Sequence, residues 1–225
     1  MKTSLPAMIA GLVFASAALV AAPFEGKVNF TLTSGRSQPQ QLSYQMKGGK
    51  IRVDLPGQTM MGGMIIDPAA KKTTVIMTGQ QMYMEMAMPD VVAQAAEAKP
   101  GEAKLEKTGE KEKILGYDAE KYIATFKNEK TELWLAEGIG TFMSPGAGNP
   151  MGGGPGGGGP GLQAWEKALA GKELFPLRVI GKDLRMEATA IQKQSLPDAL
   201  FTPPAGFQKF DMGAMMPGGL PGFGK

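Results

Sequence analysis

The sequence predicts a mainly β (α+β) fold: one strongly curved antiparallel sheet that forms an incomplete barrel, with short helices over the concave face. Short segments of alternating polarity recur along the chain, and turn residues separate them. The strand–helix–strand rhythm of a parallel sheet does not occur. We expect about ten strands and two short helices, and a sheet of that size must curl or close to satisfy its twist.

Residues 1–22 are typical of a cleavable signal peptide. Lys2 supplies a short positive region, residues 5–20 are apolar, and small residues lead up to Ala22. The alternative is a transmembrane anchor, but the segment is short, rich in Ala and Gly, and lacks a following cluster of charges. With no cysteine in the chain, there is no thiol for a lipid anchor. We therefore expect a periplasmic or extracellular protein with no stable membrane span after cleavage.

The first half of the mature chain contains six segments with the strand pattern. Val28, Phe30 and Leu32 alternate with polar residues, and the same period of two recurs further along. Gly48-Gly49 predicts a two-residue hairpin turn, because glycine tolerates positive φ angles. The Asp67-Pro68 pair predicts another break. The six segments are 27–33, 42–46, 51–55, 64–66, 73–77 and 82–88.

The second half alternates between strands and segments of other composition. A short helix is expected over 91–98, followed by strands at 103–108, 112–115, 121–126 and 131–136. Residues 144–161 are mostly Gly and Pro and predict a flexible loop. A helix over 162–169 and strands at 174–180 and 184–191 complete the pattern. The expected organisation is a signal peptide (1–22), a curved-sheet domain (23–210) and a disordered Met/Gly/Pro tail (211–225).

Composition excludes several classes of function. The chain has no His and no Cys, which removes most nucleophile–base pairs and most transition-metal sites. Its 24 basic and 21 acidic residues are interspersed, which argues against a nucleic-acid surface. Four carboxylates on segments of alternating polarity are typical of a solvated strand face: Glu85, Asp118, Glu120 and Glu132. We expect no enzyme activity and no cofactor.

The most unusual motif is MYMEMAM at residues 82–88. On a strand, its four methionines point to one side: Met82, Met84, Met86 and Met88. Three interpretations are open. The methionines could pack in an ordinary core, line a cavity for an acyl chain, or hold Cu(I) through their thioethers.

The favoured hypothesis is an exported, non-enzymatic binder of an apolar ligand, such as a lipid or lipoprotein acyl chain, held in a cavity of the sheet. The alternatives are a Cu(I)-binding periplasmic protein that uses the same four methionines, and a structural envelope protein with no ligand. Binding requires inner surface that the protein's own side chains do not fill. The expected cavity wall consists of Met82, Met84, Met86, Met88, Val53, Leu133, Leu135 and Trp165.

Several motifs resemble a bacterial family of exported domains with no assigned function. They are FEGKV (24–28), GGMIID (62–67), LGYDA (115–119), FPL (175–177) and LPDALF (196–201). The ending FTPPAGF (201–207) is also similar to that of the periplasmic lipoprotein carriers (LolA, LolB and LppX-like). The resemblance implies an incomplete antiparallel barrel with helices over its concave side and an apolar cavity that, in the carriers, receives acyl chains. No ligand-contacting residue of the carriers is matched here.

Overall fold

A computed structural model describes residues 24–35, 38–55, 62–87, 104–126, 129–143, 165–166, 168–169 and 172–210. Within these residues, twelve strands form one sheet in the order β12-β6-β5-β4-β3-β2-β1-β11-β10-β9-β8-β7. The predicted signal peptide (1–22), the predicted helix (91–98), the predicted Gly/Pro loop (144–161), the predicted tail (211–225) and Met88 lie outside the described residues. The strands are β1 (Gly26–Ser34), β2 (Gln40–Lys47), β3 (Lys50–Asp54), β4 (Gly63–Asp67), β5 (Lys72–Met77), β6 (Met82–Ala87), β7 (Lys104–Ile114), β8 (Tyr117–Phe126), β9 (Glu129–Ala136), β10 (Phe175–Ile180), β11 (Leu184–Lys193) and β12 (Gln208–Lys209).

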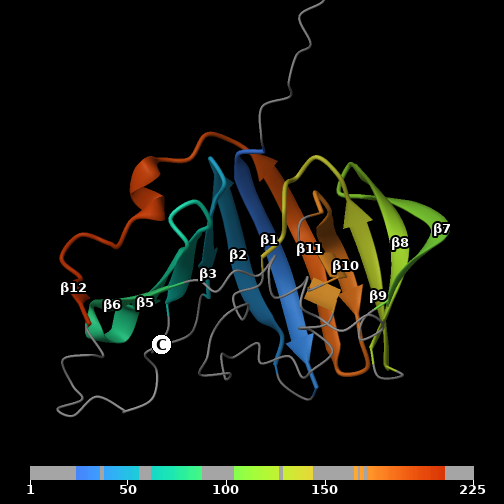
Figure 1. Ribbon diagram of the computed structural model, residues 1–225, viewed down its shortest axis with the longest axis horizontal. Helices are drawn as coiled ribbons and strands as arrows, with labels where there is room; N and C mark the ends of the chain where they lie inside the picture. Colours follow the sequence, from blue (N-terminus) through green and yellow to red (C-terminus); the bar gives the residue numbers. More distant parts are fainter. Residues whose placement is uncertain are drawn as a thin grey trace, which may run out of the picture.

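The sheet consists of two antiparallel meanders, β1 to β6 and β7 to β11, which are joined where β1 pairs with β11 (Figure 1). The two-residue strand β12 adds to the free side of β6 in parallel orientation. A mainly β fold with one large, open, curved sheet is therefore confirmed. The sheet ends at β12 on one side and at β7 on the other, so its strand order does not close on itself.

The predicted layer of helices over the concave face is not supported. In the described part of the chain, α-helical residues are confined to 165–166 and 168–169, within the expected 162–169 segment. Two 3-10 turns, η1 (Thr78–Gln80) and η2 (Asp198–Phe201), are the other helical elements there. No helix among the described residues has the length and apolar character needed to cross a membrane.

Turn chemistry explains where several strands end. Gly48 and Gly49 have φ angles of 56° and 80° and join β2 to β3, as predicted. Leu115 and Gly116, with φ angles of 49° and 88°, form an equivalent turn, so β8 begins at Tyr117, earlier than expected. The two strands predicted at 103–108 and 112–115 are one strand, β7, whose pairing register shifts between Lys107 and Lys111.

Cross-strand pairing defines an inner face of the sheet. Residues directly opposite one another in antiparallel strands point to the same side, and the register therefore links six strands in one apolar row: Val28, Tyr44, Val53, Met64, Val75 and Met84. The first five of these side chains are at most 5% exposed. They belong to the main hydrophobic core, which therefore lies on this face.

The opposite, outer face of β3 to β6 is covered by the segment 194–210, which we call the C-terminal strap. In Figure 1 it runs from the upper end of β11 to the far side of the sheet, where β12 lies beside β6. Leu196 and Phe201 of the strap pack with Ile65 and Ile76 in a second apolar cluster, and all four are at most 6% exposed. The strap thus gives β4 and β5 a second buried face.

Polar contacts attach the beginning of the strap to Glu25, the residue before β1, and to Lys47 of β2. The Glu25 carboxylate accepts hydrogen bonds from the Leu196 amide (2.6 Å) and the Ser195 hydroxyl (3.2 Å). Lys47 pairs with Asp198 at 2.9 Å and donates to the Leu196 carbonyl. These contacts fix the position at which the chain leaves β11 and crosses the outer face.

The strap should loosen in acid because of Glu25. The hydrogen bond from the Leu196 amide, assisted by Ser195 and Lys47, holds the pKa of Glu25 below its usual value. A carboxyl whose pKa is lowered by folding stabilises the folded state above its unfolded pKa of about 4.3, and that contribution is lost as the pH falls through the lowered value. We expect the hydrogen-exchange protection factors of residues 196–201 to fall as the pH drops below about 4.3 and through the lowered native pKa of Glu25.

The matched variant is Glu25→Gln, which keeps an acceptor oxygen but does not titrate. Its strap should show weaker protection at neutral pH and little further loss in acid. Equal pH dependence in the variant and the wild-type protein would contradict the assignment to Glu25.

Candidate functional site

Four methionines at one end of the inner face form what we call the methionine strip: Met77, Met82, Met84 and Met86. Met82 lies opposite Met77, Met84 opposite Val75, and Met86 opposite Thr73, so all four point to the core side of the sheet. Each is only partly buried, and Met86 packs against the main core. The apolar face thus becomes accessible at β5 and β6.

Met77 was not among the predicted site residues, although the sequence brings it near the motif. It is separated from Met82 by the turn at Thr78–Gln80, where Gln81 adopts a left-handed conformation with φ of 51°. This turn sets the register between β5 and β6, which places Met77 beside Met82. If the Gly79-Gln80 break is interpreted as a hairpin turn, the sequence predicts that Met77 lies opposite Met82.

The other predicted wall residues share the inner face but lie inside the core. Val53 and Leu133 are 0% exposed, Leu135 is 2% exposed and Trp165 is 1% exposed. Leu133 pairs with Val179, Val179 with Met186, and Met186 with Leu32 of β1. Leu32 lies on the same face of β1 as Val28, so Leu133 and Val53 share the inner face. The structure therefore brings the predicted residues to one face, and of those described only the methionines retain exposed surface.

Aromatic side chains of the protein itself occupy the middle of this face. The Phe142 ring stacks on Tyr44 at 5.4 Å and on Trp165 at 5.6 Å between centroids. Phe175 lies edge-on to Tyr44 and Phe142 at 5.5 and 5.6 Å. We call this group the aromatic cluster: Phe30, Tyr44, Phe142, Trp165 and Phe175. It places Phe142, which follows β9, and Trp165, which precedes β10, against the sheet.

The polar atoms of this cluster differ in how they are satisfied. The Tyr44 hydroxyl donates to the Met143 carbonyl (3.1 Å) and accepts from the Met143 amide (2.9 Å). Burial raises the pKa of Tyr44 far above its usual value, so the phenol is neutral. The buried Trp165 indole N–H has no acceptor within the described part of the chain, and a buried donor of this kind costs about 1–3 kcal/mol when unpaired.

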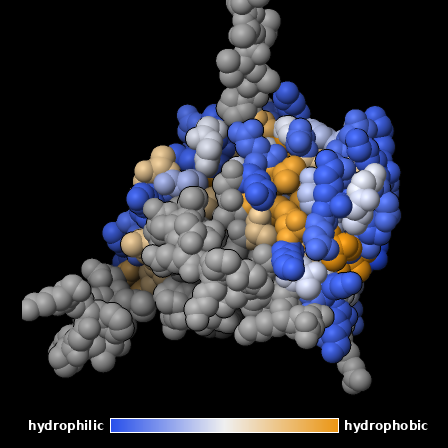
Figure 2. Space-filling view, turned by 45° about the vertical axis from the view of Figure 1, so that its right-hand side comes forward, coloured by the Kyte–Doolittle hydropathy of each residue, from blue (hydrophilic) through white to orange (hydrophobic). Residues whose placement is uncertain are grey.

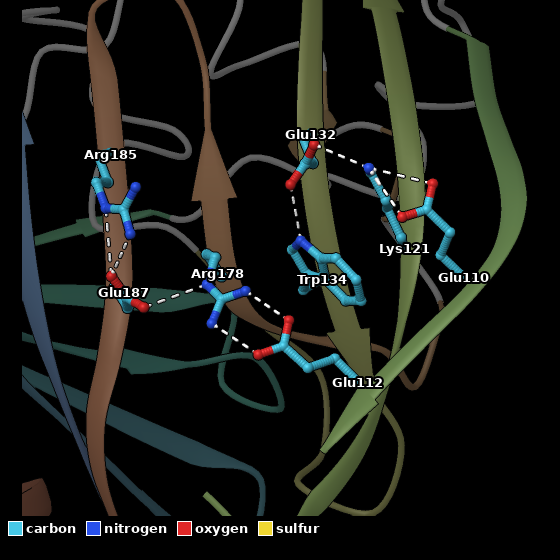
Figure 3. A network of polar contacts seen from close by, with 8 residues as sticks. All are labelled: Glu110, Glu112, Lys121, Glu132, Trp134, Arg178, Arg185 and Glu187. Carbon is cyan, nitrogen blue, oxygen red and sulfur yellow. Dashed lines mark hydrogen bonds and ion pairs between the residues drawn. The ribbon is translucent and has the colours of Figure 1, made fainter. Parts of the chain in front are cut away.

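The outer face of β7 to β11 carries a network of charged side chains around Trp134 (Figure 3). Lys121 and Arg178 each lie 5.7 Å from the centre of the indole ring, a cation–π distance. Arg178 forms a two-pronged pair with Glu112 (2.8 and 3.1 Å). The indole N–H donates to Glu132 at 2.8 Å. This face is therefore polar but internally paired. Figure 2 shows the molecule from another direction, turned by 45° from Figure 1, with hydrophilic residues bordering a narrow hydrophobic strip.

The carboxylates singled out in the sequence are paired with cations. Glu85 lies 2.7 Å from both Lys72 and Lys209, whose hydrogen bonds hold its pKa below the usual value. Burial raises the pKa of Glu132, but hydrogen bonds from Trp134 and Lys121 outweigh it, and the net shift is downward. Glu120 pairs with Lys107 at 2.6 Å, and Asp118 pairs with Lys113 at 3.4 Å.

Comparison with solved structures finds low-identity similarities. The chain is 13% identical to PNGF-II with a TM-score of 0.48, covering 85% of this chain but only 32% of that one. It is 11% identical to an uncharacterized conserved protein from Thermus thermophilus (TM-score 0.47; 83% and 90% covered). It is 13% identical to a LolA superfamily protein from Nitrosomonas europaea (TM-score 0.33; 80% and 90% covered).

No curated protein matches the sequence. A family profile does match, over residues 24–207, and this range includes the strands of both meanders and most of the strap. The family has no assigned function, in agreement with the resemblance seen in the sequence. The chain belongs to the family described as "Domain of unknown function (DUF4412)".

Proposed function

We propose that this protein is an exported, non-enzymatic binder of an apolar ligand, such as a lipid or lipoprotein acyl chain, and that the ligand contacts the methionine strip. The observation that carries the proposal is the change in burial along one inner-face row. From Val28 to Val75 its side chains are at most 5% exposed, whereas Met84, at the end of the same row, is partly exposed.

Methionine suits such a contact. Its unbranched, polarizable side chain adapts to guests of different shape, and removing an acyl chain from water is favourable by about 0.8 kcal/mol per methylene. Because the aromatic cluster occupies the middle of the inner face, the ligand binds beside that cluster, along β5 and β6. Val53, Leu133 and Leu135 then support the wall from within the core instead of contacting the ligand.

Two features support a role without catalysis. The described carboxylates of β6, β8 and β9 named above lie in ion pairs, and where their pKa is displaced it is lowered. A general acid needs the opposite displacement, toward neutral pH. The inner-face side chains of β5 and β6 are methionines, Val75 and Thr73, which cannot serve as an acid–base pair.

Delipidated protein should take up a fluorescent fatty acid saturably, and Met84→Glu should weaken the affinity at least about tenfold, because a carboxylate beside an acyl chain must lose its hydration. Met84→Leu should bind as the wild type does, since the volume and apolar character are kept. The measurement is a fluorescence titration over several chain lengths.

Tyr83→Glu is the matched control. Tyr83 lies next to Met84 on β6 but on the outer face, opposite Ile76, so its replacement adds the same charge to the same strand without touching the inner face. Equal losses in Met84→Glu and Tyr83→Glu would reject the site. Flat titrations of the wild-type protein at every chain length would reject the function and leave a structural envelope protein.

A further inference from the structure

We propose that Met77, Met82 and Met84 also form a binding site for Cu(I), with three thioether sulfurs as ligands. This inference goes beyond the binding of an apolar ligand, because it depends on sulfur and not on apolar surface alone. It also changes the ligand set expected from the sequence: Met77 enters it, and Met88 lies outside the described residues.

The strand pairing places these three side chains within reach of one ion. Met77 and Met82 are directly opposite each other on β5 and β6, and side chains so placed have Cβ atoms about 4.5–5.5 Å apart. Met84 is the next residue on the same face of β6, about 6.6 Å along the strand from Met82. Three rotatable bonds allow each sulfur to turn toward a shared point.

The surroundings favour a soft, singly charged metal. Thioethers are soft, neutral ligands that select Cu(I) over the harder divalent ions. Along the inner face of β5 and β6, the remaining described positions are Thr73, Val75 and Met86, none of which carries a carboxylate or an imidazole. Glu85 points to the outer face, where Lys72 and Lys209 hold it. The site therefore offers sulfur and little else.

Partial burial adds a second favourable condition. Met77, Met82 and Met84 are neither sealed in the core nor fully exposed, so an ion can enter and is then shielded from water on the core side by Val75, which is 5% exposed. By contrast, Met46, Met64 and Met186 are buried to 6% exposure or less. These core methionines provide internal controls of the same chemistry.

The experiment is anaerobic competition for Cu(I) between the mature protein and a chromophoric chelator. The wild-type chain should hold one Cu(I), and X-ray absorption should show sulfur coordination. Met82→Leu and Met84→Leu should each weaken retention at least about tenfold.

Met186→Leu in the core and Met151→Leu in the Gly/Pro-rich segment are the matched controls, and both should retain copper. The proposal is overturned if the chelator removes all Cu(I) from the wild-type protein. It is equally overturned if the Met77→Leu/Met82→Leu/Met84→Leu triple variant holds copper as tightly as the wild type, because other methionines would then be the ligands. Neither result would affect the fatty-acid titration, so failure of the copper site and failure of the proposed function are distinguishable.

Discussion

Replacing Phe175 by alanine should lower the free energy of unfolding by about 3–5 kcal/mol, the range for a buried Phe whose cavity cannot collapse. Phe175 is 0% exposed, and its ring contacts Phe30, Tyr44 and Phe142 at centroid distances of 6.0, 5.5 and 5.6 Å. These partners come from β1, from β2 and from the chain after β9. The loss would therefore weaken the junction of the two meanders, and chemical denaturation followed by tryptophan fluorescence would measure it.

Leu115→Ala provides the comparison. Leu115 is the one large hydrophobic side chain that is exposed among the described residues, at 45%, so removing its atoms leaves no cavity and should change stability by about 0.5 kcal/mol or less. Phe175→Leu should lie between the two. A Phe175→Ala variant as stable as Leu115→Ala would mean that the aromatic cluster does not hold the meanders together.

Local pattern predicts the strands well where one face is buried. In β1 and β3, buried and partly exposed residues alternate along the strand, which is the period of two that the sequence displays. The same pattern correctly puts Met82, Met84 and Met86 on one side of β6. Sequence alone does not say which strands pair. The junction of β1 with β11 joins residues about 160 positions apart, and no local signal encodes such a contact.

The pattern of residues 194–210 does not predict that the strap covers the sheet, but the sequences of β4 and β5 indicate that some segment must cover them. In β4 and β5, four consecutive residues are buried (Gly63–Ile66 and Thr73–Ile76). In the sequence each strand contains three consecutive apolar residues (64–66 and 75–77), and such a run indicates a strand covered on both faces. Something had to cover Ile65 and Ile76, but the segment that does so is rich in Pro and polar residues and shows no period. Likewise, Trp165 was interpreted as cavity wall, and only the contacts of Phe142 reveal its place in the aromatic cluster.

Phe201→Ala should open the strap without unfolding the sheet. Phe201 is 6% exposed and belongs to a small cluster with Ile65, Ile76 and Leu196, and a truncation of this kind costs about 3–5 kcal/mol. The measured loss cannot exceed the free energy that holds the strap on the sheet. A larger loss detaches the strap, while the inner core stays folded. We expect exchange protection in residues 196–207 to fall about a hundredfold, with β1 and β2 little changed.

Detachment of the strap has a second expected consequence at β6. The backbone amides of Gln208 and Phe210 donate to the carbonyls of Gln81 (2.9 Å) and Tyr83 (2.7 Å), so β12 covers part of the β6 edge, and an uncovered edge is a template for pairing with another chain. The Phe201→Ala variant should therefore associate at high concentration, as measured by light scattering, whereas Leu115→Ala should not. If Phe201→Ala lowered protection equally in the strap and in β1, the strap would be part of one cooperative unit with the inner core. The two apolar clusters on opposite faces of the sheet would then stabilise each other through β4 and β5, the strands that both clusters share.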